Sequence, residues 1–127
     1  MNNYDDWRND PRPTQQLIEM ALAEKDEDIY WDLVLRLQYR GTREVFDAAR
    51  ELCASDDPSK RELGADVLAQ LGVPERTFPK QSTDLLLELL KSEEEPRVLA
   101  SIASALGHIH DPRSVEPLTR LKNHPAC

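Results

Sequence analysis

Two histidines and an aspartate are the residues of this sequence whose spacing could hold a metal ion. His108 and His110 are separated by one residue, and Asp111 follows directly. Imidazole nitrogens and carboxylate oxygens are ordinary zinc ligands, but the sequence places no fourth ligand at a recognisable spacing. We therefore interpret the segment as a solvated connection between helices, and we predict no metal site and no cofactor.

Clustered carboxylates are the second candidate chemistry. They occur at Glu93-Glu94-Glu95 and at Asp56-Asp57. A carboxylate pair of the glycosidase type needs a walled pocket that raises the pKa of one member. Acidic residues placed just before a helix more simply stabilise the positive end of the helix dipole. We adopt the second interpretation.

Thiols are the third candidate. A nucleophilic cysteine needs a partner base and a lowered pKa, and no base can be nominated for Cys53 or Cys127. Cys53 falls beside the apolar stripe of its predicted helix, so we predict a buried structural thiol. Cys127, at the end of the sequence, is expected to be exposed. With no glycine-rich phosphate loop either, the sequence predicts a protein that is not an enzyme and has no catalytic residues.

The composition excludes several classes of partner. The formal net charge is −8 and the isoelectric point is about 4.8, so the chain repels phosphate backbones. The longest apolar run, Leu85-Leu86-Leu87, is too short to span a bilayer, and the acidic N-terminus does not resemble a secretory signal. Two cysteines without a CxxC motif are no disulfide framework. We expect a cytoplasmic protein that binds neither nucleic acid nor membranes.

Apolar residues recur at helical spacing along most of the chain. Residues 1–12 lack this periodicity and predict a flexible tail, whereas residues 13–127 predict one domain of about seven helices. The pattern also repeats. A shift of 35 residues superimposes Leu63, Val67, Leu68 and Leu71 on Val98, Ile102, Ala103 and Leu106, and a shift of 34 in the other direction gives Ile29, Leu33, Val34 and Leu37. We interpret Gly72 and Gly107 as the residues that close two of these helices.

The connections between the predicted helices resemble those of a known family. The stretch 104–118 contains Ala-Leu-Gly, a short bridge, Asp-Pro-Arg and Val-Glu-Pro-Leu, and residues 68–72 repeat its first part. This is similar to HEAT repeats, particularly the short bacterial type first noticed in phycobilin lyases. The resemblance implies an all-α superhelix, a solenoid of stacked antiparallel helix pairs. It also implies that the second helix of each pair, at 28–39, 59–71 and 95–106, lines the concave face.

The sequence departs from the family in two respects. An arginine that HEAT repeats often carry early in the second helix is replaced by Tyr30, Gly64 and Leu99, which puts the usual polar ladder between repeats in doubt. In addition, the helix predicted at 112–123 looks like the first of a pair whose partner is missing. We therefore expect this chain to be the N-terminal part of a longer array.

A candidate binding strip follows from the positions that are not core. On the three second helices these are Asp28, Glu62 and Arg97, then Asp32, Asp66 and Ser101. Stacked acidic residues on a concave face predict a site for the basic segment of a protein partner, although an ordinary solvated face is an equal alternative. Trp31 lies off the core stripe. We favour its packing against the helix at 14–24 over a role as an aromatic anchor for the partner.

The sequence thus predicts a protein–protein interaction scaffold whose specificity comes from shape and charge along a rigid concave surface. The first alternative is a bilin lyase or isomerase, which rests on the family resemblance alone. The second alternative is a DNA-binding HEAT-like protein, which would need a basic concave face where this sequence predicts an acidic one.

Overall fold

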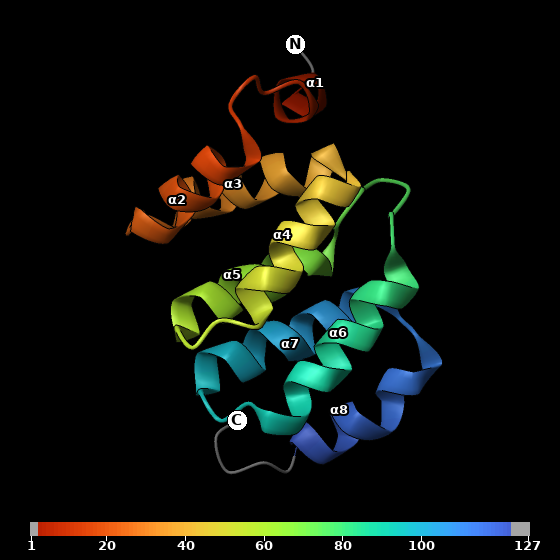
Figure 1. Cartoon of the computed structure of the whole chain (residues 1–127). Coiled ribbons are helices and arrows are strands. Elements are labelled where there is room, and N and C mark those ends of the chain that lie inside the picture. Colours follow the sequence, from red (N-terminus) through yellow and green to blue (C-terminus); the bar gives the residue numbers. More distant parts are fainter. Residues whose placement is uncertain (1–2, 123–127) are drawn as a thin grey trace.

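The chain is built from helices throughout the part that the structure describes. A computed structural model describes the backbone of residues 3–122 and the side chains of residues 6–121. In this part there are eight α-helices and one 3-10 turn (Figure 1). Their bounds are α1 (Asn3–Arg8), α2 (Thr14–Ala23), α3 (Glu27–Arg40), α4 (Arg43–Cys53), α5 (Pro58–Ala69), α6 (Pro79–Ser92), α7 (Pro96–Ile109), η1 (Pro112–Ser114) and α8 (Val115–Lys122).

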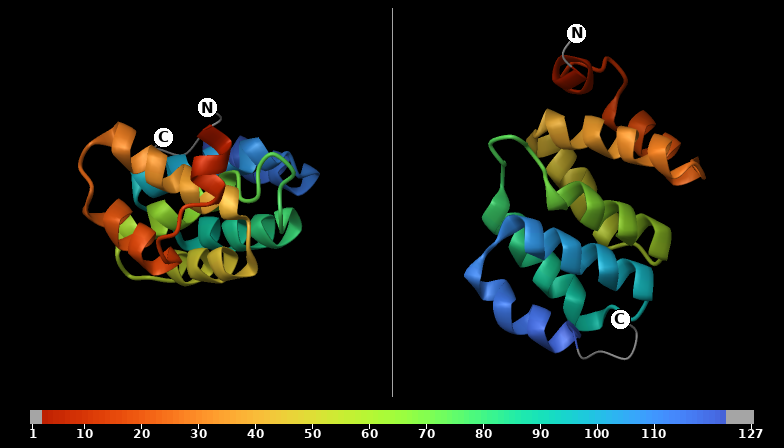
Figure 2. Two further views of the ribbon diagram at one scale, coloured as in Figure 1. Left: turned by 90° about the horizontal axis from the view of Figure 1, so that it is seen from above. Right: turned by 180° about the vertical axis from the view of Figure 1, so that it is seen from behind.

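The helices form pairs that stack side by side. The pairs are α2 with α3, α4 with α5, and α6 with α7, and α8 follows as a further first-type helix. The second helices α3, α5 and α7 lie next to one another in one layer, which is seen most directly from behind (Figure 2). The first helices α4 and α6 neighbour each other in the other layer. The prediction of an all-α solenoid of helix pairs is confirmed.

Local sequence signals explain where these helices begin. The side chains of Asp26, Thr42 and Asp57 accept hydrogen bonds from backbone amides in the first turns of α3, α4 and α5. These caps satisfy amide groups that have no partner inside the helix. Helices α5, α6 and α7 each begin with a proline, whose missing amide costs nothing at that position.

The core is one continuous cluster that runs through all three pairs. Leu33, Leu63 and Ile102 lie in it with exposed fractions of 2% or less, as the repeat pattern predicts. Two matched positions are wrong, because Ala103 is only partly buried and Ile29 is 47% exposed. The neighbouring residue Tyr30, which is half-buried, packs against the core instead. Its side chain points toward α5, where its hydroxyl is hydrogen-bonded to Asp66.

Gly107 does not close its helix, contrary to the prediction. Helix α7 continues to Ile109, and His110 adopts the left-handed conformation at its C-cap, with φ of 61°. The stop comes from Asp111-Pro112, because proline excludes a helical conformation at the preceding residue. Gly72, in contrast, has φ of 81° just beyond α5, and its amide donates to the carbonyl of Gln38 at 2.7 Å.

The longer connection between α5 and α6 serves to join two repeats. It folds back so that the Thr77 hydroxyl donates to the carbonyl of Gly41 at 2.8 Å, at the end of α3. A Cβ on Gly72 would lie 2.4 Å from the backbone nitrogen of Thr77. Glycine is therefore required here by both the backbone angle and the close approach.

The two glycines give a matched pair of substitutions. Gly107→Ala is expected to raise the free energy of unfolding by about 0.5–1 kcal/mol, because Gly107 lies within a helix and no atom within 4 Å opposes a Cβ. Gly72→Ala is expected to lower it by more than about 1 kcal/mol, through positive φ and collision with Thr77. Urea unfolding followed by circular dichroism measures both. Equal effects of the two substitutions would contradict this account.

Candidate functional site

A cleft opens on the layer of second helices, beside the turn that joins α2 to α3. Its volume is about 450 Å³, and α3, α5 and α7 each contribute to its wall. We call it the second-helix cleft. It is lined by Ala21, Leu22, Glu24, Lys25, Glu27, Tyr30, Trp31, Ser59, Glu62, Asp66, Arg97 and Ser101.

The cleft contains most of the predicted binding strip, but not all of it. Glu62, Asp66, Arg97 and Ser101 all line it, together with the predicted aromatic anchor Trp31. Two predicted residues do not. Asp28 is exposed outside the cleft. Asp32 also lies outside it, where it accepts hydrogen bonds from Trp7 of α1 and from Arg36 while 44% of its side chain stays exposed. The part of the strip that lines the cleft is therefore shorter than the sequence predicts, and Asp32 is engaged by Trp7 of the N-terminal segment and by Arg36.

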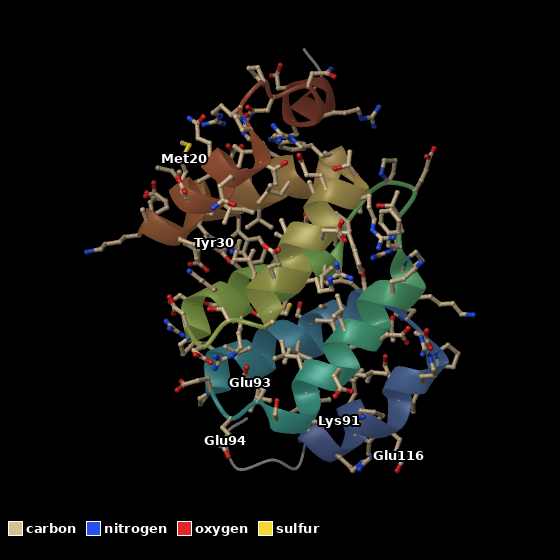
Figure 3. The ribbon with its side chains drawn as sticks, viewed as in Figure 1. Met20, Tyr30, Lys91, Glu93, Glu94 and Glu116 are labelled. Carbon is tan, nitrogen blue, oxygen red and sulfur yellow. The ribbon has the colours of Figure 1, made fainter. Side chains whose placement is uncertain are left out.

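Asp66 forms the floor of the cleft and is only 6% exposed. One carboxylate oxygen accepts a hydrogen bond of 2.6 Å from the hydroxyl of Tyr30 on α3, where Figure 3 shows Tyr30 between α3 and α5. The Asp66 backbone carbonyl accepts a second bond, of 2.9 Å, from the Gln38 amide. Burial raises the pKa of Asp66 to about 6, against the opposing hydrogen bonds from Tyr30 and Ser101.

A polar ladder between repeats is present after all, which corrects the doubt raised by the sequence. Tyr30, Asp66 and Ser101 connect α3, α5 and α7 in order, and the Arg97 guanidinium donates to the Ser59 hydroxyl at 3.1 Å. Tyr30 stands at a position where HEAT repeats often carry an arginine. Its phenol reaches α5 and donates one hydrogen bond to Asp66. The sequence carried a signal for this ladder in the aligned positions of Asp66 and Ser101.

A second link between repeats involves one of the clustered carboxylates. Glu93 accepts a forked pair of hydrogen bonds from Arg61, at 2.7 and 3.1 Å, and others from the amides of Glu94 and Glu95. Burial opposes its ionisation, but these donors hold the pKa of Glu93 below its usual range. Glu93 is thus a structural residue at the start of α7, which agrees with a capping role.

Trp31 is exposed to a larger extent than we expected. Its side chain lines the cleft beside Ala21 and Leu22 of α2, but 41% of the residue stays accessible to solvent. The expectation that α2 covers it is wrong in this respect, because Leu17 and Ile18 of α2 are buried in the core and Trp31 is left partly open beside Ala21 and Leu22. The Trp31 ring lies edge to face with Tyr30, at 5.4 Å and 86°.

The segment 1–12, predicted as a tail, includes the helix α1 packed on α3. The Trp7 indole donates to Asp32 at 3.1 Å, and its ring lies 5.2 Å from that of Tyr39. The Asp10 carboxylate accepts hydrogen bonds from the guanidinium groups of Arg12 and Arg36, at 2.6 and 2.9 Å. The Asp10 side chain is only 3% exposed. The sequence did not reveal the contacts of Trp7 with Asp32 and of Asp10 with Arg36, because they join residues 25 and 26 positions apart and produce no periodic pattern.

The remaining candidates from the sequence are the two cysteines and the histidines. Cys53 is buried, as predicted, and burial together with the charge of Glu93 raises its pKa to about 12. Cys127 lies outside the described residues. His110 caps α7, and within the part of the chain that the structure describes no three His, Cys, Asp or Glu side chains are grouped so as to hold a metal ion. A helix that could cross a membrane is likewise not found among these residues.

A larger depression, of about 670 Å³, lies between α6 and α8 and is lined mainly by leucine side chains and by charged residues such as Lys91, Glu94 and Arg120. None of the predicted site residues lines it. The second-helix cleft brings together an exposed aromatic ring and carboxylates for which no salt bridge is found among the described residues, so that cleft is the candidate site.

Replacing Asp66 with asparagine should remove a pH dependence of stability. The folded protein holds the Asp66 proton more tightly than the unfolded chain does, since its pKa rises from 3.8 to about 6. The free energy of unfolding of the unsubstituted protein should therefore fall relative to Asp66→Asn between about pH 4 and pH 6, by up to about 3 kcal/mol, and stay constant above. Urea titrations across this range, with exposed Glu51→Gln as control, measure the difference. A difference that does not vary with pH would refute the assignment.

Asp10→Asn should release α1 from α3. Arg12 and Arg36 hold the pKa of Asp10 far below its usual range, so the ionised form stabilises the fold. We expect a loss of about 1.5–3 kcal/mol in unfolding free energy and a shift of the Trp7 indole N–H signal in NMR spectra. The control Asp47→Asn, which removes exposed ion pairs with Arg43 and Arg50, should cost less than about 1 kcal/mol. Similar costs for both substitutions would show that Asp10 is no anchor.

The geometry can be set beside known proteins. A family model described as PBS lyase HEAT-like repeat matches residues 98–124, a segment that includes most of α7, all of η1 and α8. No curated protein and no solved structure matches the chain. The matched segment and the stacked helix pairs that precede it share one arrangement, in which each second helix packs on the next. Residues 98–124 are therefore similar to a HEAT-like repeat, and the described part of the chain has an all-α fold of stacked helix pairs that is consistent with such repeats.

Proposed function

We propose that this protein is a non-catalytic scaffold that binds a protein partner through the second-helix cleft. The proposal rests on the net negative charge of the cleft, which lies beside an exposed tryptophan side chain. Four carboxylates, from Glu24, Glu27, Glu62 and Asp66, face two cations, from Lys25 and Arg97. A cleft with excess negative charge and an accessible aromatic ring suits a basic segment of a partner.

The rigidity of the cleft supports the same proposal. Its walls come from three neighbouring repeats that are tied by the Tyr30–Asp66 hydrogen bond and by the Arg97–Ser59 hydrogen bond. A binding surface that is already ordered loses little conformational entropy on association. Specificity then depends on where the repeats place the charges, which is the usual mode of a solenoid surface.

The structure changes which substitutions test the proposal. Asp32 is paired with Trp7 and Arg36, and Asp66 is buried, so reversal of either charge would disturb folding. Glu27 is exposed and Glu62 is partly exposed, and both line the cleft. The double variant Glu27→Lys/Glu62→Lys is therefore the appropriate probe.

The double variant should lose its partner. Affinity purification from the native source, quantified by mass spectrometry, is expected to show at least a tenfold loss of specific partners, since the reversed charges repel a basic segment. The control Glu19→Lys/Glu51→Lys makes the same change in net charge at exposed positions outside the cleft and should retain them. Retention of the same partners by both variants would contradict binding in this cleft.

A lyase-related role is a second candidate, and the description of the matching family model is what favours it. In this case the protein would act on a bilin and its acceptor subunit. Mixing the protein with a bilin and an acceptor phycobiliprotein subunit, and following the visible absorption of the product, separates the two proposals. A DNA-binding role is disfavoured by the carboxylates of the cleft, which would repel phosphates.

A further inference from the structure

The corner formed by Tyr30 and Trp31 is the most specific feature inside the second-helix cleft. The two rings meet edge to face, with centroids 5.4 Å apart and an interplanar angle of 86°. The hydroxyl of Tyr30 donates to Asp66 at 2.6 Å, so the tyrosine is held in place from the floor of the cleft. Trp31 is not enclosed, since 41% of the residue remains exposed. The corner therefore presents a fixed aromatic surface to solvent.

Carboxylates border this aromatic corner. Glu62 and Asp66 are four residues apart on α5, which puts them on one side of that helix, and both line the cleft. Glu27 precedes Trp31 by four residues on α3 and lines the cleft as well. The charge of Glu62 is one of the causes that oppose ionisation of Asp66, so the carboxylates repel each other. A cation placed between them would relieve this repulsion.

In the part of the chain that the structure describes, no lysine or arginine side chain forms a salt bridge with Glu27 or Glu62. Among the described residues, the salt bridges formed by arginine side chains of α3 and α5 go to Asp10, Asp32 and Glu93, and none goes to Glu27 or Glu62. Arg97 enters the cleft from α7, but the hydrogen bond of its guanidinium is to the neutral hydroxyl of Ser59, at 3.1 Å. The acidic side of the corner is thus available to a group from outside.

We propose that the Tyr30–Trp31 corner, together with Glu27 and Glu62, is a subsite for one arginine side chain of the partner. This inference rests on the proposed function and names the group that the cleft recognises. A planar guanidinium stacks on an aromatic face and can donate to two carboxylates at once. A lysine ammonium is a strongly hydrated point charge and makes no such fork, so arginine is preferred over lysine.

The subsite can be tested with small probes, before any partner is known. The variant Trp7→Phe leaves Trp31 as the single tryptophan, whose fluorescence reports directly on the corner. The probes are blocked pentapeptides Gly-Gly-X-Gly-Gly, with X as arginine, lysine or glutamine. We expect saturable changes in Trp31 emission with the arginine peptide, at least fivefold tighter than with the lysine peptide, and none with the glutamine peptide.

Matched variants separate the subsite from general attraction to an acidic protein. In the same background, Glu62→Gln should weaken the arginine peptide at least fivefold, whereas Glu51→Gln, which removes an exposed charge on α4, should change it less than twofold. Arg97→Ala should strengthen binding, because it removes a cation from the cleft. Circular dichroism melts confirm that each variant is folded. Equal affinity for the arginine and lysine peptides, or equal effects of the two glutamine variants, overturns the proposal.

Failure of the arginine subsite and failure of the proposed scaffold function give different experimental results. If the arginine peptide leaves Trp31 emission unchanged while Glu27→Lys/Glu62→Lys still loses its partners, the subsite is wrong and the scaffold function stands. If the peptide binds as expected but partner capture is unaffected, the subsite is correct and the proposed use of the cleft is wrong.

Discussion

The burial of α5 is the constraint on which the rest of the structure depends. Seven successive residues of this helix, 63–69, are buried, so it has neighbours on nearly every side. Helix α4 approaches so closely that a Cβ on Gly64 would lie 2.7 Å from the Cys53 sulfur. A helix enclosed in this way cannot be stable within a single helix pair, because its apolar surface is covered only when α3 and α7 pack on either side.

This enclosure also determines where the polar groups of the cleft lie. Asp66 is one of the buried residues of α5, and a buried carboxylate must be hydrogen-bonded. Its partners come from both neighbouring repeats, Tyr30 and Gln38 from α3 and Ser101 from α7. The same group therefore ties three repeats together and forms the floor of the cleft, so the stacking of the repeats and the candidate site share one set of contacts.

The N-terminal segment limits the surface that remains for a partner. Asp32 and Asp66 occupy equivalent positions in successive repeats, yet Asp32 is paired with Trp7 and Arg36 on the outside of the cleft, whereas Asp66 forms its buried floor. Helix α1 is held by the buried carboxylate of Asp10 and by one aromatic contact, both of them made with α3. Part of the α3 surface is thus used within the molecule, and the residues of α3 that line the cleft are Glu27, Tyr30 and Trp31.

The sequence by itself determined the fold class, the helix pairs, the repeat period and most of the core, because these depend on apolar spacing and on local capping signals such as Asp57-Pro58. It also predicted that Glu62, Asp66, Arg97 and Ser101 share one surface, since one repeat period aligns their positions, and that Trp31 lies off the core stripe; the structure places all five around one cleft. Only the tertiary structure decided that Asp32 pairs with Trp7, that Ile29 is exposed and that Tyr30 bridges to Asp66. These outcomes depend on contacts between residues that are distant in the chain, whereas the period of a helix reports only which face a residue shares with its near neighbours.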